Sequence, residues 1–234
     1  KDRSNEWPKQ LRKEKEEEKM WEKVKKLFAP SDMTVGTPWK KIVAFMIPML
    51  IGNIAQQMYN TVDSIVVGRY VGDNALAAVG SAGPIFQLLL VLFAGIAVGA
   101  GIMVSQYFGA KARDELSETI GCCITLTILA SLALMILSPF IVRPLLELLD
   151  TPASIIDWCD SYLMILMIGI GGLAFYNILS GILRGMGDSV SALLYLLIAT
   201  VMNIVLDIFF VKDLQMGVSG VALATVIAQT FSGI

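Results

Sequence analysis

Six long runs without a charged residue constrain this chain more than any other feature of its sequence. A transmembrane helix needs about 20 predominantly apolar residues to cross a hydrocarbon core about 30 Å thick. Each run is long enough, provided that the fifth continues through Asp207 to Val211. The six runs are 42–62, 74–110, 119–142, 161–183, 189–206 and 214–234.

The composition agrees with a membrane protein and excludes an ordinary soluble enzyme. The 234 residues are 56% hydrophobic and 16% charged, whereas soluble domains are about 45–50% apolar and about 25% charged. The runs are too long and too evenly apolar for barrel strands, which have about 9–11 residues of alternating polarity. We therefore expect an all-α polytopic membrane protein with six transmembrane helices.

The predicted organisation is a charged extension followed by one helical unit. The extension covers 1–31, and the transmembrane lobe covers 32–234. In the second run we expect a connecting loop that ends near Pro84. The predicted helices are about 38–68, 84–108, 117–149, 155–183, 189–211 and 217–234.

Lys and Arg set the expected orientation in the bilayer. Residues 1–41 hold 12 basic and 8 acidic side chains, and Lys111, Arg113 and Arg184 fall in connections on the same side. Cytoplasmic loops carry the excess of basic residues, so the N-terminus is predicted to be cytoplasmic. Glutamates offset the basic residues of the extension and no basic surface studded with aromatic residues follows, so no nucleic-acid partner is expected.

Two acids lie inside the predicted spans, where a charged side chain is costly and usually functional. Asp63 is six residues before Arg69, and Asp207 is five residues before Lys212. At 1.5 Å per residue, both acids lie roughly 8–9 Å below the outer ends of their helices. The two carboxyl groups are therefore expected at matching depths.

Further polar side chains share helix faces with these acids. Residues three, four and seven apart lie on one face of a helix. On the fifth span, Asn203 is four residues before Asp207, and on the sixth Thr225 lies roughly 18 Å in from the outer end. On the first span, a predicted polar stripe consists of Asn53, Gln56, Asn60 and Asp63, with Tyr59 four residues before the acid.

Oxygen atoms arranged in this way can bind Na⁺, or a carboxylate can hold a proton. Either cation relieves the repulsion between two neighbouring carboxylates. The alternative is that Asp63 and Asp207 only cap helix ends, where water, Arg69 or Lys212 satisfies them. No other metal and no cofactor is expected, and without His or a base near a Cys the chain is not expected to be an enzyme.

Several other residues in the spans are candidates for gating or packing. Pro48 removes a backbone hydrogen bond and opens a kink, which is either a hinge or a fixed bend. Asn177 is a candidate for lining a substrate path, although a hydrogen bond between helices is the simpler interpretation. Gly95 with Gly99, and Gly181 with Gly185, have the spacing that lets helices approach closely.

The first span and two loops resemble one known family. The stretch DMTVGTPWKKIVAFMIPMLIGNIAQQMYNTVDSIVVGRYVGDNALAAVG, with SQYFGAKA and LRGMGDS further on, resembles the multidrug and toxic compound extrusion (MATE) transporters. The resemblance covers 32–234. It implies one N-terminal lobe of a transporter with twelve spans in two lobes, the C-terminal lobe being absent from this sequence.

The resemblance also implies a function and a site. In family members with a cation site in this lobe, the ligands match Asp63, Asn203, Asp207 and Thr225, and the family's proline and tyrosine on the first helix recur as Pro48 and Tyr59. The implied activity is antiport across the cytoplasmic membrane, in which Na⁺ or H⁺ enters and an amphiphilic, often cationic, drug-like compound leaves. The alternatives are a lipid-linked sugar flippase of the same superfamily and a non-transporting membrane fragment that needs a partner lobe.

Overall fold

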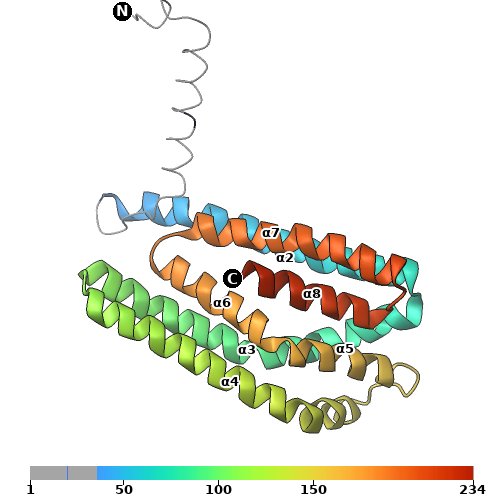
Figure 1. Cartoon of the computed structure of the whole chain (residues 1–234). Coiled ribbons are helices and arrows are strands. Elements are labelled where there is room, and N and C mark those ends of the chain that lie inside the picture. Colours follow the sequence, from blue (N-terminus) through green and yellow to red (C-terminus); the bar gives the residue numbers. More distant parts are fainter. Residues whose placement is uncertain (1–19, 21–35, 234) are drawn as a thin grey trace, which may run out of the picture.

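The computed structural model describes residue 20 and residues 36–233, and these residues form a bundle of helices (Figure 1). No strand occurs among the described residues, so the prediction of an all-α protein is confirmed. The predicted extension 1–31 lies outside the described residues, apart from Met20. The elements are α2 (Pro38–Tyr70), α3 (Asp73–Ala110), α4 (Arg113–Leu148), α5 (Ile156–Ile168), α6 (Ile170–Gly185), α7 (Ser189–Asp207), the π-helix η2 (Ile208–Asp213) and α8 (Val218–Ser232).

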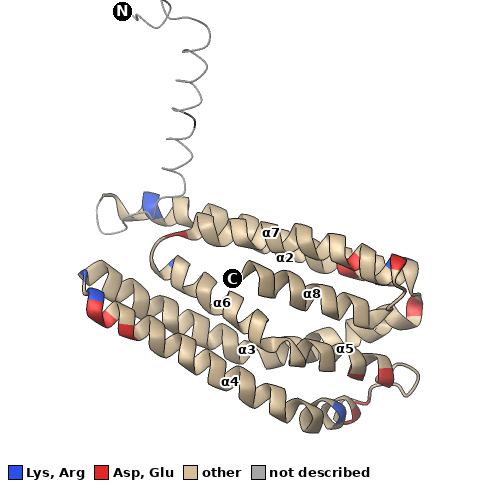
Figure 2. Cartoon of the chain, viewed as in Figure 1, with Lys and Arg blue, Asp and Glu red and all other residues tan. Residues whose placement is uncertain are grey.

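The helices have the lengths and the surface of a membrane protein. α2, α3, α4 and α7 with η2 are each long and apolar enough to cross a bilayer, and the bent pair of α5 and α6 makes a fifth span. α8, at 15 residues, is a shorter apolar helix. Charged residues gather at the two ends of the bundle, and the long middle is almost free of them (Figure 2). Large apolar side chains are exposed along this middle, which suits a surface that faces lipid.

α8 occupies the middle of the bundle (Figure 1). On one side it packs against α7, which lies along α2, and on the other it packs against α5 and α6. α3 and α4 complete the far side, where α3 packs closely along α6. The large side chains that are almost fully buried include Phe93, Leu146, Leu163, Met167 and Ile170. Residues of α2, α7 and α8 are thereby brought to one another inside the lobe.

The second predicted helix begins earlier than expected. We expected a loop up to Pro84, but α3 begins at Asp73 and Pro84 lies in its interior. Gly72, with φ of 116°, makes the turn after α2, and Asp73 stands in the first turn of α3, where a negative charge suits the helix dipole. A proline inside a membrane helix is tolerated where neighbouring groups satisfy the freed carbonyl.

The fourth predicted helix is bent rather than straight. α5 and α6 meet at Gly169 at an angle of 55°. At this point α8 packs directly against the backbone, since a Cβ atom on Gly169 would overlap Val226 and one on Gly172 would overlap Thr230. The bend therefore depends on a contact between distant segments, which the local sequence does not reveal.

α3 and α6 approach each other through glycine. A Cβ atom on Gly181 would lie 2.5 Å from the backbone oxygen of Ala97, and one on Gly185 would lie 2.6 Å from that of Gly101. The expected close approach at Gly181 and Gly185 is therefore present. The expectation for Gly95 and Gly99 is wrong within the described part of the chain, where a Cβ atom at either position would meet nothing within 4 Å.

Gly181→Ala should lower the stability of the lobe, whereas Gly95→Ala should not. The added methyl group at position 181 meets backbone, which yields less easily than a side chain, so we expect a loss of roughly 1–3 kcal/mol. At position 95 the methyl group has room and Ala is the better helix former by about 1 kcal/mol. Thermal unfolding of the purified chain in detergent measures both, and equal changes for the two variants would contradict this account of the α3–α6 contact.

Candidate cation site

The four residues predicted to bind a cation are all buried on three helices of the lobe. Asp63 lies on α2, Asn203 and Asp207 on α7, and Thr225 on α8. Their exposed fractions are 6%, 1%, 0% and 5%. α7 lies between α2 and α8, so its polar face turns toward both neighbours.

Thr225 is the centre of the hydrogen bonds in this cluster. The hydroxyl group of Tyr59 donates to Thr225 Oγ1 at 3.2 Å, and Asn203 Nδ2 donates to the same atom at 3.4 Å. These two bonds tie α2 and α7 to α8. Tyr59 is itself 8% exposed and is thus part of the cluster.

Several oxygen atoms of the cluster have no hydrogen-bond partner among the residues that the structure describes. They are Asp63 Oδ1, Asn203 Oδ1 and both carboxyl oxygens of Asp207. The carboxyl groups of Asp63 and Asp207 are also close enough to interact electrostatically. Buried polar atoms in native proteins are nearly always satisfied, and each exception calls for an explanation. Carboxylate and carbonyl oxygens are the ligands that hard cations prefer, so this cluster can accept a cation or share a proton.

The basic residues at the helix ends do not satisfy the two acids. Arg69 and Lys212 are exposed, and within the described residues neither forms an ion pair with Asp63 or Asp207. Asp63 and Asp207 themselves are buried. The part of the helix-capping alternative in which Arg69 or Lys212 satisfies the acids therefore does not fit the geometry.

The backbone around Asp207 is irregular. Asp207 is the last residue of α7, and the chain continues as the π-helix η2 without an intervening loop. π-helical turns are rare and occur frequently at functional sites, because the wider turn displaces the following residues. The continuous helical path explains why the fifth apolar run reaches beyond Asp207.

One residue of this region was missed by the sequence analysis. Tyr162 of α5 is 8% exposed and close enough to interact electrostatically with Asp63 and with Asp207. It stands two residues after Asp160 in an apolar run, and only the packing of α5 against α8 brings it near the acids. The sequence offers one signal for this residue: Tyr162 lies near the start of its apolar run, which places it near the same end of the bundle as Asp63.

The predicted polar stripe of α2 divides into a buried edge and an exposed edge. Asn53, Gln56 and Asn60 are exposed, and Asn60 Nδ2 donates to Gln57 Oε1 at 3.2 Å. Asn60 and Asp63 are three residues apart, which places them about 60° from each other around the helix. This angle is enough to cross from the face that packs on the lobe to the face that does not. The stripe is therefore not a single binding surface.

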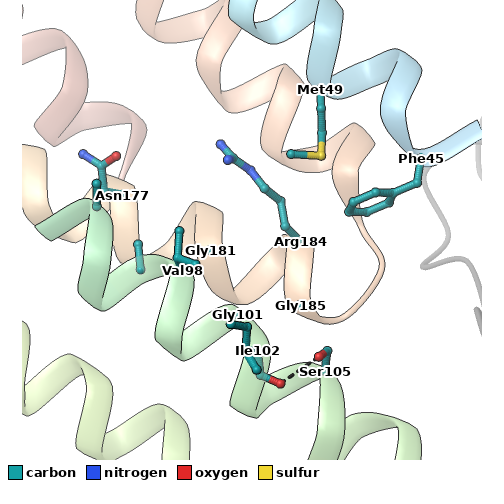
Figure 3. Close-up of a pocket in the computed structure, with 12 residues that line it drawn as sticks. Phe45, Met49, Val98, Gly101, Ile102, Ser105, Asn177, Gly181, Arg184 and Gly185 are labelled. Carbon is teal, nitrogen blue, oxygen red and sulfur yellow. Dashed lines mark hydrogen bonds between the residues drawn. The ribbon is translucent and has the colours of Figure 1, made fainter. Parts of the chain in front are cut away.

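The remaining candidates, Pro48 and Asn177, line two hollows near the other end of α2. Pro48 lies inside α2, which is helical on both sides of it, and lines a small hollow with Asn53 and Gln56. Asn177 donates to the backbone oxygen of Leu173 on its own helix at 2.8 Å and lines a larger hollow between α2, α3 and α6 (Figure 3). The structure thus separates these residues from the acid cluster.

A bundle of long apolar helices around a cluster of buried polar residues defines a helical, polytopic membrane protein. The MatE family model matches residues 48–209, and the chain belongs to this family. Its resemblance to the MATE transporters, noted from three sequence stretches, is thereby confirmed.

Individual relatives agree with this assignment. The chain is 32% identical to the probable multidrug resistance protein YoeA of Bacillus subtilis, over 81% of the chain and 42% of that protein. It is 28% identical to DNA damage-inducible protein F of Escherichia coli, over 78% of the chain and 40% of that protein. A solved structure of a multidrug resistance MATE transporter in an outward-facing conformation superimposes with a TM-score of 0.79 at 32% identity, over 85% of the chain and 44% of that structure. The chain therefore spans less than half the length of the relatives it matches.

Thr225→Val should destabilise the lobe more than the matched change Thr200→Val. The first removes the acceptor of two buried donors, on Tyr59 and Asn203, and leaving buried donors unpaired costs about 1–3 kcal/mol. Thr200 bonds only to the Leu196 carbonyl of its own helix, so its loss should cost less than about 1 kcal/mol. Unfolding midpoints of the two variants in the same detergent test this, and equal losses would mean that Thr225 does not link the three helices.

Proposed function

We propose that this chain is the N-terminal lobe of a multidrug efflux transporter and that its acid cluster binds the coupling cation. Two kinds of observation support the proposal. The relatives carry names that refer to multidrug resistance, and the lobe holds a pair of buried acids with unpartnered oxygens at one depth. The single observation that carries the cation site is the burial of both carboxyl oxygens of Asp207 without a partner.

The cluster offers a physical route from cation binding to transport. Two buried carboxylates repel each other, and a Na⁺ ion or a proton between them removes this repulsion. Because the ligands lie on α2, α7 and α8, the cation would draw three helices together. A conformational change follows only if the cation binds one arrangement of these helices more tightly than the other. Exchange with a cationic compound results if cation and compound favour opposite arrangements.

The flippase alternative expects basic groups inside the lobe to match an anionic substrate. Among the described residues, the buried charged side chains are Asp63, Asp188 and Asp207, and no Lys or Arg is buried. The charge buried between α2, α7 and α8 thus favours a cation over an anionic headgroup at the acid cluster. The alternative of a fragment that needs a partner agrees with our proposal, since we propose a second lobe against which this one moves. We also propose that the transporter lies in the inner membrane and that the drug-like compound enters it from the cytoplasmic side.

The coupling ion should reveal itself in the stability of the purified lobe. A ligand that binds only the folded state stabilises it by about 2.7 kcal/mol at a concentration 100 times its dissociation constant. We therefore expect NaCl to raise the unfolding midpoint above that in KCl if the ion is Na⁺. If the ion is H⁺, acid should stabilise the wild type more than Asp207→Asn, and the two salts should act alike.

The controls separate the site from general salt effects. Asp213→Asn removes an exposed acid of η2 and should retain the full response, whereas Asp63→Asn and Asp207→Asn should lose it. In a whole transporter that contains this lobe, Asp63→Asn should abolish the cation dependence of drug efflux. Efflux with unchanged cation dependence in that variant would refute the coupling role.

A further inference from the structure

A second candidate site lies at the end of the lobe opposite the acid cluster. A hollow of about 380 Å³ opens between α2, α3 and α6. Met49 of α2 lines it and is 14 residues from Asp63, which corresponds to about 21 Å along the helix. The hollow is within the size range of small-molecule sites, about 300–1,000 Å³. It is therefore a separate place for a ligand and shares no residue with the acid cluster.

The long wall of this hollow is apolar. On α3 the lining residues extend from Ala94 to Ser105, a distance of about 16 Å along the helix. Val98 and Ile102 on this wall are 63% and 54% exposed. The hollow therefore runs from the helix ends into the depth of the hydrocarbon, and its wall is accessible from the side.

Arg184, an exposed residue, brings a positive charge without an ion-pair partner among the described residues to the same hollow. Its side chain extends from the last turn of α6 into the space beside Met49 (Figure 3). Its Nη2 donates a long hydrogen bond of 3.5 Å to Ser180 Oγ, and among the described residues Arg184 forms no ion pair. Arg184 also lines the small neighbouring hollow with Asn53 and Gln56. The guanidinium group thus stands between two hollows that also contain amide groups.

A purely structural role explains the position of Arg184 but not its surroundings. A cation in the last turn of a helix interacts favourably with the helix dipole, which is worth about 0.3–1 kcal/mol. That interaction needs neither an adjoining hollow of ligand size nor an apolar wall. Asp188, four residues further on, caps the start of α7 by accepting a hydrogen bond from the backbone N–H of Ser191 at 2.9 Å. Among the described residues it forms no ion pair with Arg184, so the charge of Arg184 remains available to a ligand.

We propose that this hollow binds an anionic phospholipid, with the phosphate at Arg184 and the start of an acyl chain along α3. Arginine forms paired, charge-assisted hydrogen bonds with phosphate oxygens. Basic pockets between transmembrane helices bind anionic headgroups, and Arg184 stands at a helix end, the level at which phosphates lie in a bilayer. The apolar wall of about 16 Å favours a lipid over a free phosphate ion, which would leave Val98 and Ile102 uncovered.

Binding of lipid to the purified chain tests this inference. The chain in a neutral detergent is titrated with dioleoylphosphatidylglycerol, with dioleoylphosphatidylcholine and with inorganic phosphate, and bound lipid is counted by native mass spectrometry. We expect the anionic lipid to bind, with Arg184→Gln weakening it about tenfold or more through loss of charged hydrogen bonds. Val98→Phe places a larger side chain on the apolar wall and leaves Arg184 unchanged. This variant should also weaken binding of the anionic lipid, because the hollow becomes narrower.

A matched control variant distinguishes an effect of the hollow from the loss of any basic residue. Arg113→Gln removes an exposed basic residue at the start of α4, next to the end of α3, and should bind lipid as the wild type does. Equal binding of the two lipids, or unchanged binding in Arg184→Gln, would overturn the proposal. Displacement of the lipid by millimolar inorganic phosphate would also overturn it, in favour of a soluble anion. The response to Na⁺ or acid, measured on the same samples, stands or falls separately because Arg184 is remote from Asp63.

Discussion

A membrane offers no water to polar groups along most of a helix, and this constraint orders the whole lobe. Backbone groups are satisfied within helices, and polar side chains must bond to their own helix, to a neighbour or to a ligand. Thr200 and Asn177 bond to carbonyls of their own helices. Thr225 is satisfied by two neighbouring helices. Asp63 and Asp207 keep oxygen atoms that have no such partner among the described residues, and these are the atoms to which the proposed cation or proton would bind.

The same constraint explains which parts of the fold were predictable. Charged residues mark the helix ends because they are costly in lipid, and the predicted limits of the first and third helices accordingly lie close to those of α2 and α4. The two larger errors have different causes. Pro84 does not begin α3, because the turn is made earlier at Gly72 and a proline is tolerated inside a membrane helix. Gly169 bends the fourth span where α8 packs against its backbone, and that contact has no local signature.

The candidate site was predictable to the extent that it depends on helix geometry alone. Depth along a helix and the four-residue spacing placed Asp63, Asn203 and Asp207 together, and they are buried together. Rotation about the helix axis was less predictable, since the face of α2 that meets α7 includes Tyr59 and Asp63 but excludes Asn60. Tyr162 and Arg184 were missed as site residues, because only the packing of different helices gives them their neighbours. Tyr162 lies near the two acids, and Arg184 lies at the hollow, only once the bundle has formed.

α2 runs from the acid cluster to the hollow beside Arg184, so a change in this one helix affects both regions. Near one end it carries Asp63 and Tyr59, and near the other it contributes Met49 and Phe45 to the hollow beside Arg184. Pro48 lies at the second of these regions, at a point where one backbone hydrogen bond of the helix is missing. A bend at Pro48 would change the width of the hollow directly, whereas it would change the acid cluster only by tilting the far end of the helix. A ligand in the hollow would thus oppose or favour the bend through local contacts with Phe45 and Met49. A cation at Asp63 would act on the same bend from about 22 Å away, so the two ligands would influence each other without any direct contact.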